Sequence, residues 1–224
     1  MNQRFKNHST LIAITVISLG VSTVISPGAA AADQLSIVSA YLCLLLLGAA
    51  LLIGPWHVFR NGRTLGHSYI RRDIGIWAAL NGLLHFFLAN ALSMNYEYLG
   101  KYVDNALVPP SPEIRSQLYS WGTILGFVIA VLFVVLVMLS NDWMVRKVGS
   151  KWWKRIQRLS YLGFLSTCAH AFAFQALESR EALWIIVVLL VTILVLIGQG
   201  YGIVSVKRLR TRKFQNAVRT PVET

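Results

Sequence analysis

Six long apolar runs constrain the fold of this 224-residue chain more than any other feature of its sequence. They cover residues 10–26, 36–54, 73–94, 118–140, 159–177 and 183–205. An apolar helix of about 20 residues spans the hydrocarbon core of a bilayer, because its backbone polar groups are bonded to one another. The sequence therefore predicts an all-α integral membrane protein, built as a six-helix transmembrane bundle with little chain left for a soluble domain.

The basic residues predict the orientation of this bundle. The net charge is +12, and most Lys and Arg fall in the N-terminus, the loops at 55–72 and 141–158, and the tail after 205. These segments share one side of a six-span bundle, so the positive-inside rule places both termini in the cytoplasm. We expect a bacterial inner membrane, with anionic lipid as a partner of the basic segments and no nucleic acid.

The runs divide the chain into three segments. Residues 1–35 hold the first helix and a short outer loop, 36–205 hold the core, and 206–224 form a basic cytoplasmic tail. The first run also resembles a signal peptide cleaved near Ala32, so retention and cleavage both stay open. Gly54 and Pro55 are expected to end the second helix.

Two histidines lie deep inside separate apolar runs at matching depth. His85 follows Asp73 by 12 residues, and His170 follows Arg158 by 12 residues. Both imidazoles should therefore lie roughly 18 Å along their helices from the cytoplasmic edge. An ionisable side chain is costly in the bilayer interior and marks a functional site there. Two at one depth suggest a shared ligand, and haem held by two histidines is the obvious candidate.

Small residues share a helical face with each histidine. Gly82 precedes His85 by three residues, and Gly163 precedes His170 by seven. They would let a porphyrin approach the backbone, although close packing of helices explains them equally well. A polar contact across the bundle or a proton relay would also explain the histidines, but relays usually include carboxylates, which the interiors of these runs lack. His8, His57 and His67 are expected at exposed interfacial positions.

Two stretches that lead to these histidines carry a family resemblance. One runs from Arg71-Arg72 through residue 76 to His85, and the other from residue 140 through residue 161 to His170. With the six-span layout, they resemble the ferric reductase-like transmembrane domain superfamily over roughly 36–205. That superfamily includes the haem-binding membrane subunit of periplasmic methionine sulfoxide reductase and the membrane cores of NADPH oxidases.

The resemblance implies a b-type haem protein that carries electrons across the membrane, as part of an oxidoreductase system. The donor would be a cytoplasmic flavin reductase or a quinol, and the acceptor an extracytoplasmic protein or small molecule. It also implies which residues bind the cofactor. His85 and His170 would be the iron ligands, with Gly82 and Gly163 beside the haem. Arg71 and Arg72 would also bind the cofactor or would face the donor, together with Lys151, Lys154 and Arg155.

The sequence departs from the family pattern at three positions. Gln157 stands 13 residues before His170, where related oxidases carry a second haem-ligating histidine, and the matching position on the other helix, near residue 71, holds arginine. We therefore expect one haem. Ala89 replaces an aromatic residue of the family.

Two other functions stay open. One is a haem-binding membrane sensor or assembly subunit without turnover, and the other is a haem-free bundle or transporter. The sequence has no glycine-rich dinucleotide fingerprint, so any flavin is expected on a partner protein.

Overall fold

The computed structural model describes residues 3–25, 31–62, 69–93, 112–178 and 182–219, and these segments are helical apart from short turns. Residues 95–111 of the loop predicted between the third and fourth runs lie outside them, as does His67, whereas residues 112–117 of that loop belong to the helix that begins at Pro112. In chain order the helices are α1 (Gln3–Ile25), α2 (Ala31–Asn61), α3 (Tyr69–Ser93), α5 (Pro112–Met138), α6 (Asp142–Val148), α7 (Ser150–Gln157), α8 (Leu159–Glu178) and α9 (Ala182–Arg219). The predicted all-α class is confirmed.

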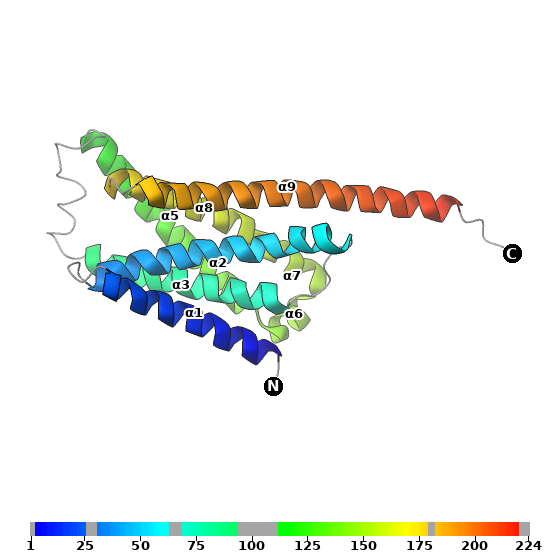
Figure 1. The fold of residues 1–224 in the computed structure, drawn as a ribbon, viewed down its shortest axis with the longest axis horizontal. Helices are drawn as coiled ribbons and strands as arrows, with labels where there is room; N and C mark the ends of the chain where they lie inside the picture. Colours follow the sequence, from blue (N-terminus) through cyan, green and yellow to red (C-terminus); the bar gives the residue numbers. More distant parts are fainter. Residues whose placement is uncertain (1–2, 26–30, 63–68, 94–111, 179–181, 220–224) are drawn as a thin grey trace.

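The long helices run alternately up and down one bundle (Figure 1). Helix α2 packs against α1, α3, α8 and α9, while α5 packs against α3 and α8. Helix α1 begins, and α9 leaves the bundle, at the same end, where α6 and α7 also lie. We call this the α6–α7 end; the opposite end holds the starts of α2 and α5.

Within the described residues, four helices are long and apolar enough to cross a membrane: α2, α3, α5 and α9. The chain is therefore a multi-pass integral membrane protein. Helices α1 and α8 form where the first and fifth spans were predicted, with 23 and 20 residues. At a rise of about 1.5 Å per residue both reach about 30 Å or more, which is the thickness of a hydrocarbon core.

Helix α2 does not end at Gly54-Pro55, so that prediction is wrong. The helix continues through Pro55 to Asn61. Pro55 packs against two glycines of α9, where a Cβ on Gly202 would lie 3.3 Å from its ring and one on Gly198 would lie 4.0 Å away. The two helices therefore approach closely at a proline that α2 accommodates within the helix, although Pro55 cannot donate a backbone hydrogen bond.

The basic tail predicted at 206–224 is not a separate segment over most of its length. Helix α9 runs without interruption from Ala182 to Arg219 and projects beyond the bundle (Figure 1). Residues 206–219 contain no Gly or Pro and are rich in Lys and Arg, which have high helix propensity. The same helix therefore carries both the last apolar run and most of the basic segment.

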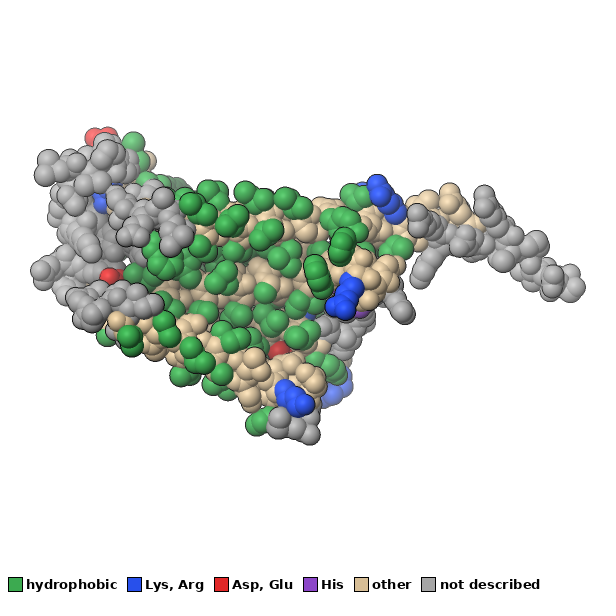
Figure 2. Space-filling view, in the orientation of Figure 1, with side chains coloured by type: hydrophobic (Ala, Val, Ile, Leu, Met, Phe, Trp, Pro, Cys, Tyr) green, Lys and Arg blue, Asp and Glu red, His purple; other side chains and the backbone are tan. Residues whose placement is uncertain are grey.

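A compact apolar core joins α2, α3, α5, α8 and α9. Its most buried members include Leu44 of α2, Ala78 of α3, Phe133 of α5, Phe164 of α8 and Val188 of α9. Many large apolar side chains point outward instead, and Figure 2 shows them spread along the helices, with most of the visible basic side chains toward the α6–α7 end. An apolar outer surface with a basic end suits lipid around the bundle.

The loop predicted at 141–158 folds into the short helices α6 and α7. Trp153 is buried, and its indole N–H donates to the carbonyl of Leu139 at 3.0 Å. Trp143 and Trp152 remain exposed, and the cations of Lys147 and Arg155 lie over their rings at 4.7 and 4.8 Å. Exposed tryptophans beside cations are typical of the membrane–water interface.

Candidate functional site

The structure brings together the two histidines that the sequence places at equal depth. The ring centroids of His85 and His170 lie 6.1 Å apart, with an angle of 76° between the ring planes. His85 lies eight residues before the end of α3 at Ser93, and His170 lies eight residues before the end of α8 at Glu178. Both rings are therefore about 12 Å along their helices from the end of the bundle opposite α6 and α7.

A backbone carbonyl of α2 orients His85. The Nδ1 atom lies 2.9 Å from the carbonyl oxygen of Ser36 and 3.0 Å from the Ser36 hydroxyl. A carbonyl oxygen can only accept a hydrogen bond, so Nδ1 carries the proton. In that tautomer the lone pair of the imidazole resides on Nε2, where a metal would bind.

Helix α5 orients His170 in the same way. Its Nδ1 donates to the carbonyl of Gly122 at 2.9 Å, so the lone pair again resides on Nε2. A Cβ on Gly126, one turn further along, would lie 3.1 Å from Cε1 of the ring. The absence of a side chain at Gly126 lets the imidazole lie directly against the backbone of α5, while Gly122 leaves room for the ring of Phe174, which would lie 2.7 Å from a Cβ there.

The separation of the rings suits one metal between them. A metal bound at about 2 Å by each Nε2 would place the two imidazole centroids about 6 Å apart. Among the described residues no three His, Cys, Asp or Glu side chains gather as a metal site. Two imidazoles at this separation could serve as a pair of ligands to an iron whose other ligands come from a porphyrin.

A cavity of about 190 Å³ lies at the histidine pair, and both rings form part of its wall. Side chains from α2, α3, α5 and α8 line it, and four of them are phenylalanines: Phe86, Phe127, Phe133 and Phe174. The Phe174 ring lies 4.8 Å from that of His170. Such a largely apolar wall with two convergent imidazoles fits a flat apolar ring system that carries a metal.

The two predicted glycines occupy different environments. Gly82 lines the cavity, but a Cβ there would collide with Phe133 and lie 2.9 Å from Sγ of Cys43. Gly163 lies against α5 instead, where a Cβ would meet Leu132 at 3.2 Å. Gly163 therefore allows close packing of α8 on α5, while Gly82 combines packing with a place in the cavity wall.

The structure does not bring the predicted arginines to the histidine pair. Arg71 and Arg72 lie in the first turn of α3, about 20 Å along the helix from His85. Arg72 is buried, with its guanidinium over the Tyr69 ring at 5.2 Å. The side chains of Lys151 and Lys154 are not among those described. Any role of these cations therefore belongs to the α6–α7 end.

Sequence reasoning missed the residues that hold the imidazoles. Gly122 and Gly126 are four residues apart on one helical face, a signal that was available within the run at 118–140. Nothing in the sequence distinguished Ser36, because its contact with His85 joins residues 49 positions apart. Only the packing of α2 against α3 brings the two together.

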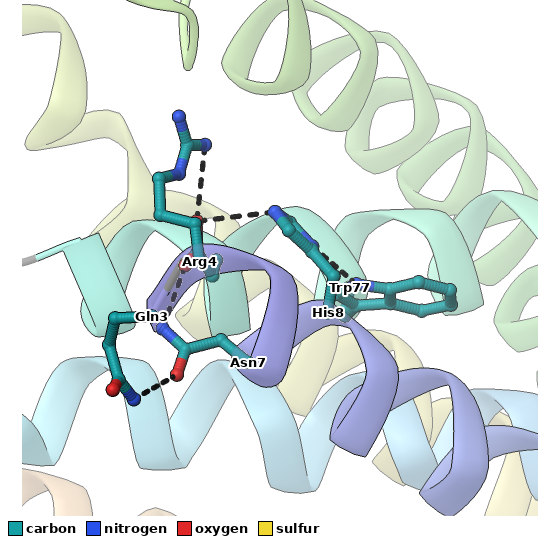
Figure 3. Close-up of polar contacts among 6 residues, drawn as sticks. Gln3, Arg4, Asn7, His8 and Trp77 are labelled. Carbon is teal, nitrogen blue, oxygen red and sulfur yellow. Dashed lines mark hydrogen bonds and ion pairs between the residues drawn. The ribbon is translucent and has the colours of Figure 1, made fainter. Parts of the chain in front are cut away.

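A second polar cluster joins α1 to α3 near the α6–α7 end (Figure 3). The carboxylate of Asp73 is fully buried and accepts hydrogen bonds from Asn7 at 2.9 Å and Arg4 at 3.3 Å. Nε2 of His8 lies 3.5 Å from the same carboxylate, while the Trp77 indole donates to His8 Nδ1 at 3.1 Å. His8 is therefore not a plain exposed residue, because it is bonded within this cluster.

One comparison with known proteins gives a match. The model of a family described as the ferric reductase like transmembrane component matches residues 35–168, which is more than half of the chain. The resemblance is thereby confirmed over that range, which includes His85 and ends two residues before His170. No curated protein and no solved structure matches the chain.

Proposed function

The chain belongs to the ferric reductase-like transmembrane component family of haem-containing membrane electron carriers, and we propose that it carries electrons across a membrane on one b-type haem. In this proposal His85 and His170 are the two axial ligands. One observation carries it: two imidazoles from different helices face each other at 6.1 Å, and a backbone carbonyl holds each by Nδ1. In the tautomer that these contacts favour, each Nε2 carries the lone pair that an iron ligand needs.

The residues of the site would bind, orient and shield the cofactor. The carbonyls of Ser36 and Gly122 hold the two rings in the ligating tautomer. The phenylalanine-rich wall limits the access of water to the site. When bound, the haem supplies a one-electron ferric–ferrous couple. If His85 and His170 both ligate the iron, no position on it would be open to a substrate, and the site would support electron transfer rather than chemistry at the iron.

The proposed topology has six spans with both termini in the cytoplasm of a bacterium. Helix α1 begins at the end of the bundle from which α9 emerges (Figure 1). That end also carries α6 and α7 with their exposed tryptophans and cations. An aromatic and basic end is what the cytoplasmic face of an inner-membrane protein presents. The histidine pair then lies in the outer half of the bilayer.

This orientation suggests where electrons enter and leave. The basic α6–α7 end would face a cytoplasmic flavin reductase, with the flavin on that partner, or would lie near a membrane quinol. The cavity wall also includes Asp33 at the start of α2, Asn90 near the end of α3 and Gln175 near the end of α8. These polar groups lie on the side of the histidine pair that would face an extracytoplasmic acceptor.

An optical spectrum of the purified protein tests the ligand assignment. We expect a sharp Soret band, split α and β bands after reduction by dithionite, and one haem per chain. His85→Ala and His170→Ala should each abolish these bands, because either change removes an axial ligand. His57→Ala, which removes the α2 histidine that does not line the cavity, is the control. Full haem content in both ligand variants would overturn the assignment.

A second measurement distinguishes a carrier from a haem-binding sensor or assembly subunit. The reduced protein is placed in sealed vesicles, and an acceptor that cannot cross the membrane is added on the outer side. Rapid reoxidation supports electron transfer to that side. A haem that stays reduced under these conditions argues for the sensor or assembly role.

A further inference from the structure

We infer that Ser36 and Ser39 of α2 are positioning residues for His85 that move the reduction potential of the haem in opposite directions. The inference rests on the proposed function, because it requires haem ligated by His85. It concerns two side-chain hydroxyls that lie one helical turn apart: that of Ser36 lies against Nδ1 of His85, and that of Ser39 donates to the Ser36 carbonyl to which the same Nδ1 is bonded. Neither touches the iron, so both would act through the imidazole.

Ser36 offers His85 two acceptors. The Nδ1 proton is directed at the Ser36 carbonyl at 2.9 Å, and the Ser36 hydroxyl oxygen lies 3.0 Å from the same nitrogen. Because Nδ1 is the donor, the hydroxyl also acts as an acceptor toward the ring. Ser36 is only 5% exposed, so water does not readily replace this contact.

Ser39 competes for one of these acceptors. Its hydroxyl donates to the Ser36 carbonyl at 2.9 Å, and its side chain is fully buried. The Ser36 carbonyl therefore accepts from both Ser39 and His85. A carbonyl that is already polarised by one donor is a weaker acceptor for a second donor directed at the same oxygen.

The two ligands differ in this respect. The Gly122 carbonyl that holds His170 belongs to a residue with no side chain, so no hydroxyl of that residue joins the contact. The support of His85 can thus be changed by single side-chain substitutions, whereas that of His170 comes from the backbone. Changes in the potential should accordingly be accessible through α2.

The expected signs follow from the electron density of the imidazole. A stronger hydrogen bond from Nδ1–H gives the ring more imidazolate character, which makes it a better donor to ferric iron and lowers the potential. Ser36→Ala removes one acceptor and should raise the potential. Ser39→Ala releases the Ser36 carbonyl for His85 and should lower it.

Redox titration of the purified, haem-loaded full-length chain tests the inference. At a fixed ambient potential, we expect the ferrous-to-ferric ratio to change roughly threefold in each variant, in opposite directions. This corresponds to about 28 mV for a one-electron couple. Ser36→Thr keeps the hydroxyl and should stay near the parent value. Ser160→Ala removes the same kind of hydroxyl-to-carbonyl bond, here to Gln157, from the far end of α8 and is the matched control.

Each outcome decides the question. Loosened packing or added water would move both alanine variants in the same direction, and that result, like the absence of any shift, overturns the inference while leaving the haem proposal intact. If Ser36→Ala does not fold, Ser39→Ala alone decides, because only a lowered potential supports the inference. A parent protein without haem refutes the proposed function and this inference together.

Discussion

The histidine pair and Asp73 both place ionisable side chains between helices, but the surroundings of the two sites differ. At the histidine pair, each ring is held by one carbonyl of a neighbouring helix, and a cavity of about 190 Å³ lies beside the rings. At Asp73, side chains of α1 surround a fully buried carboxylate and bond it directly. The first arrangement holds two rings in place beside free space, while the second satisfies its charge internally.

The difference indicates which cluster is a site and which joins helices. A buried carboxylate is costly unless it is paired and hydrogen-bonded, and three residues of α1 meet that need for Asp73. The family match begins at residue 35, so α1 lies outside it. We therefore regard the Asp73 cluster as a structural contact that attaches α1 to the core.

Asp73→Ala should have the largest effect on stability. The change leaves Arg4, Asn7 and His8 without their shared acceptor, which we expect to cost about 2–3 kcal/mol of unfolding free energy. Arg4 and His8 are each about a third exposed, so water limits the loss. Denaturation in SDS measures the change, and the haem spectrum should not move, because Asp73 lies 12 residues from His85.

Asp73→Asn is the matched variant for this experiment. It keeps the size of the side chain and one acceptor oxygen while removing the charge, so a smaller loss of stability is expected. If Asp73→Ala instead removes the haem and leaves stability unchanged, the two clusters are coupled. The distinction between the histidine pair as a functional site and the Asp73 cluster as a structural contact is then wrong.

Gly126→Ala should produce the opposite result, with a changed site and an intact bundle. A Cβ at this position would lie 3.1 Å from Cε1 and 3.4 Å from Nδ1 of His170, so the ring must shift by a few tenths of an ångström. We expect haem affinity to fall about tenfold, in the range of changes made to residues that support metal ligands. Stability without haem should rise, because Ala favours a helix over Gly by about 1 kcal/mol.

Gly200→Ala provides the control for that substitution. Gly200 also lies within a helix, α9, and a Cβ there meets nothing within 4 Å. It should therefore give a similar gain in stability with an unchanged haem titration. Equal haem affinities in the two variants would show that Gly126 does not define the position of His170.

The sequence predicted the helices and the two histidines because both follow from local pattern. Apolar runs of membrane length indicate helices, and the distance of His85 and His170 from a charged edge indicates depth. Contacts between distant segments were not accessible in this way. Pro55 lies within a helix and packs against Gly198 and Gly202 of α9, and Ser36 reaches His85 only through the packing of α2 on α3.

The contacts of the Asp73 cluster also could not be predicted from local sequence pattern. Asp73 served only as a charged edge in the sequence argument, and His8 was expected to be exposed. The contacts that bury the carboxylate join residues 66 and 69 positions apart, from the first helix to the third. No periodic pattern connects them, so only the docking of α1 reveals the pair.

Trp77→Phe should have the smallest effect on stability, and it tests whether His8 links Trp77 to Asp73. The indole N–H can only donate, so Nδ1 of His8 accepts from it and the His8 proton lies on Nε2, which faces Asp73. Loss of this bond should cost about 1 kcal/mol of unfolding free energy. Because Trp77 acts on Asp73 through His8, the cost should shrink when Trp77→Phe is made in an Asp73→Asn background. Trp121→Phe, at a tryptophan that is 71% exposed, should change stability little and is the control. Fully additive costs of Trp77→Phe and Asp73→Asn would mean that His8 does not link the two residues.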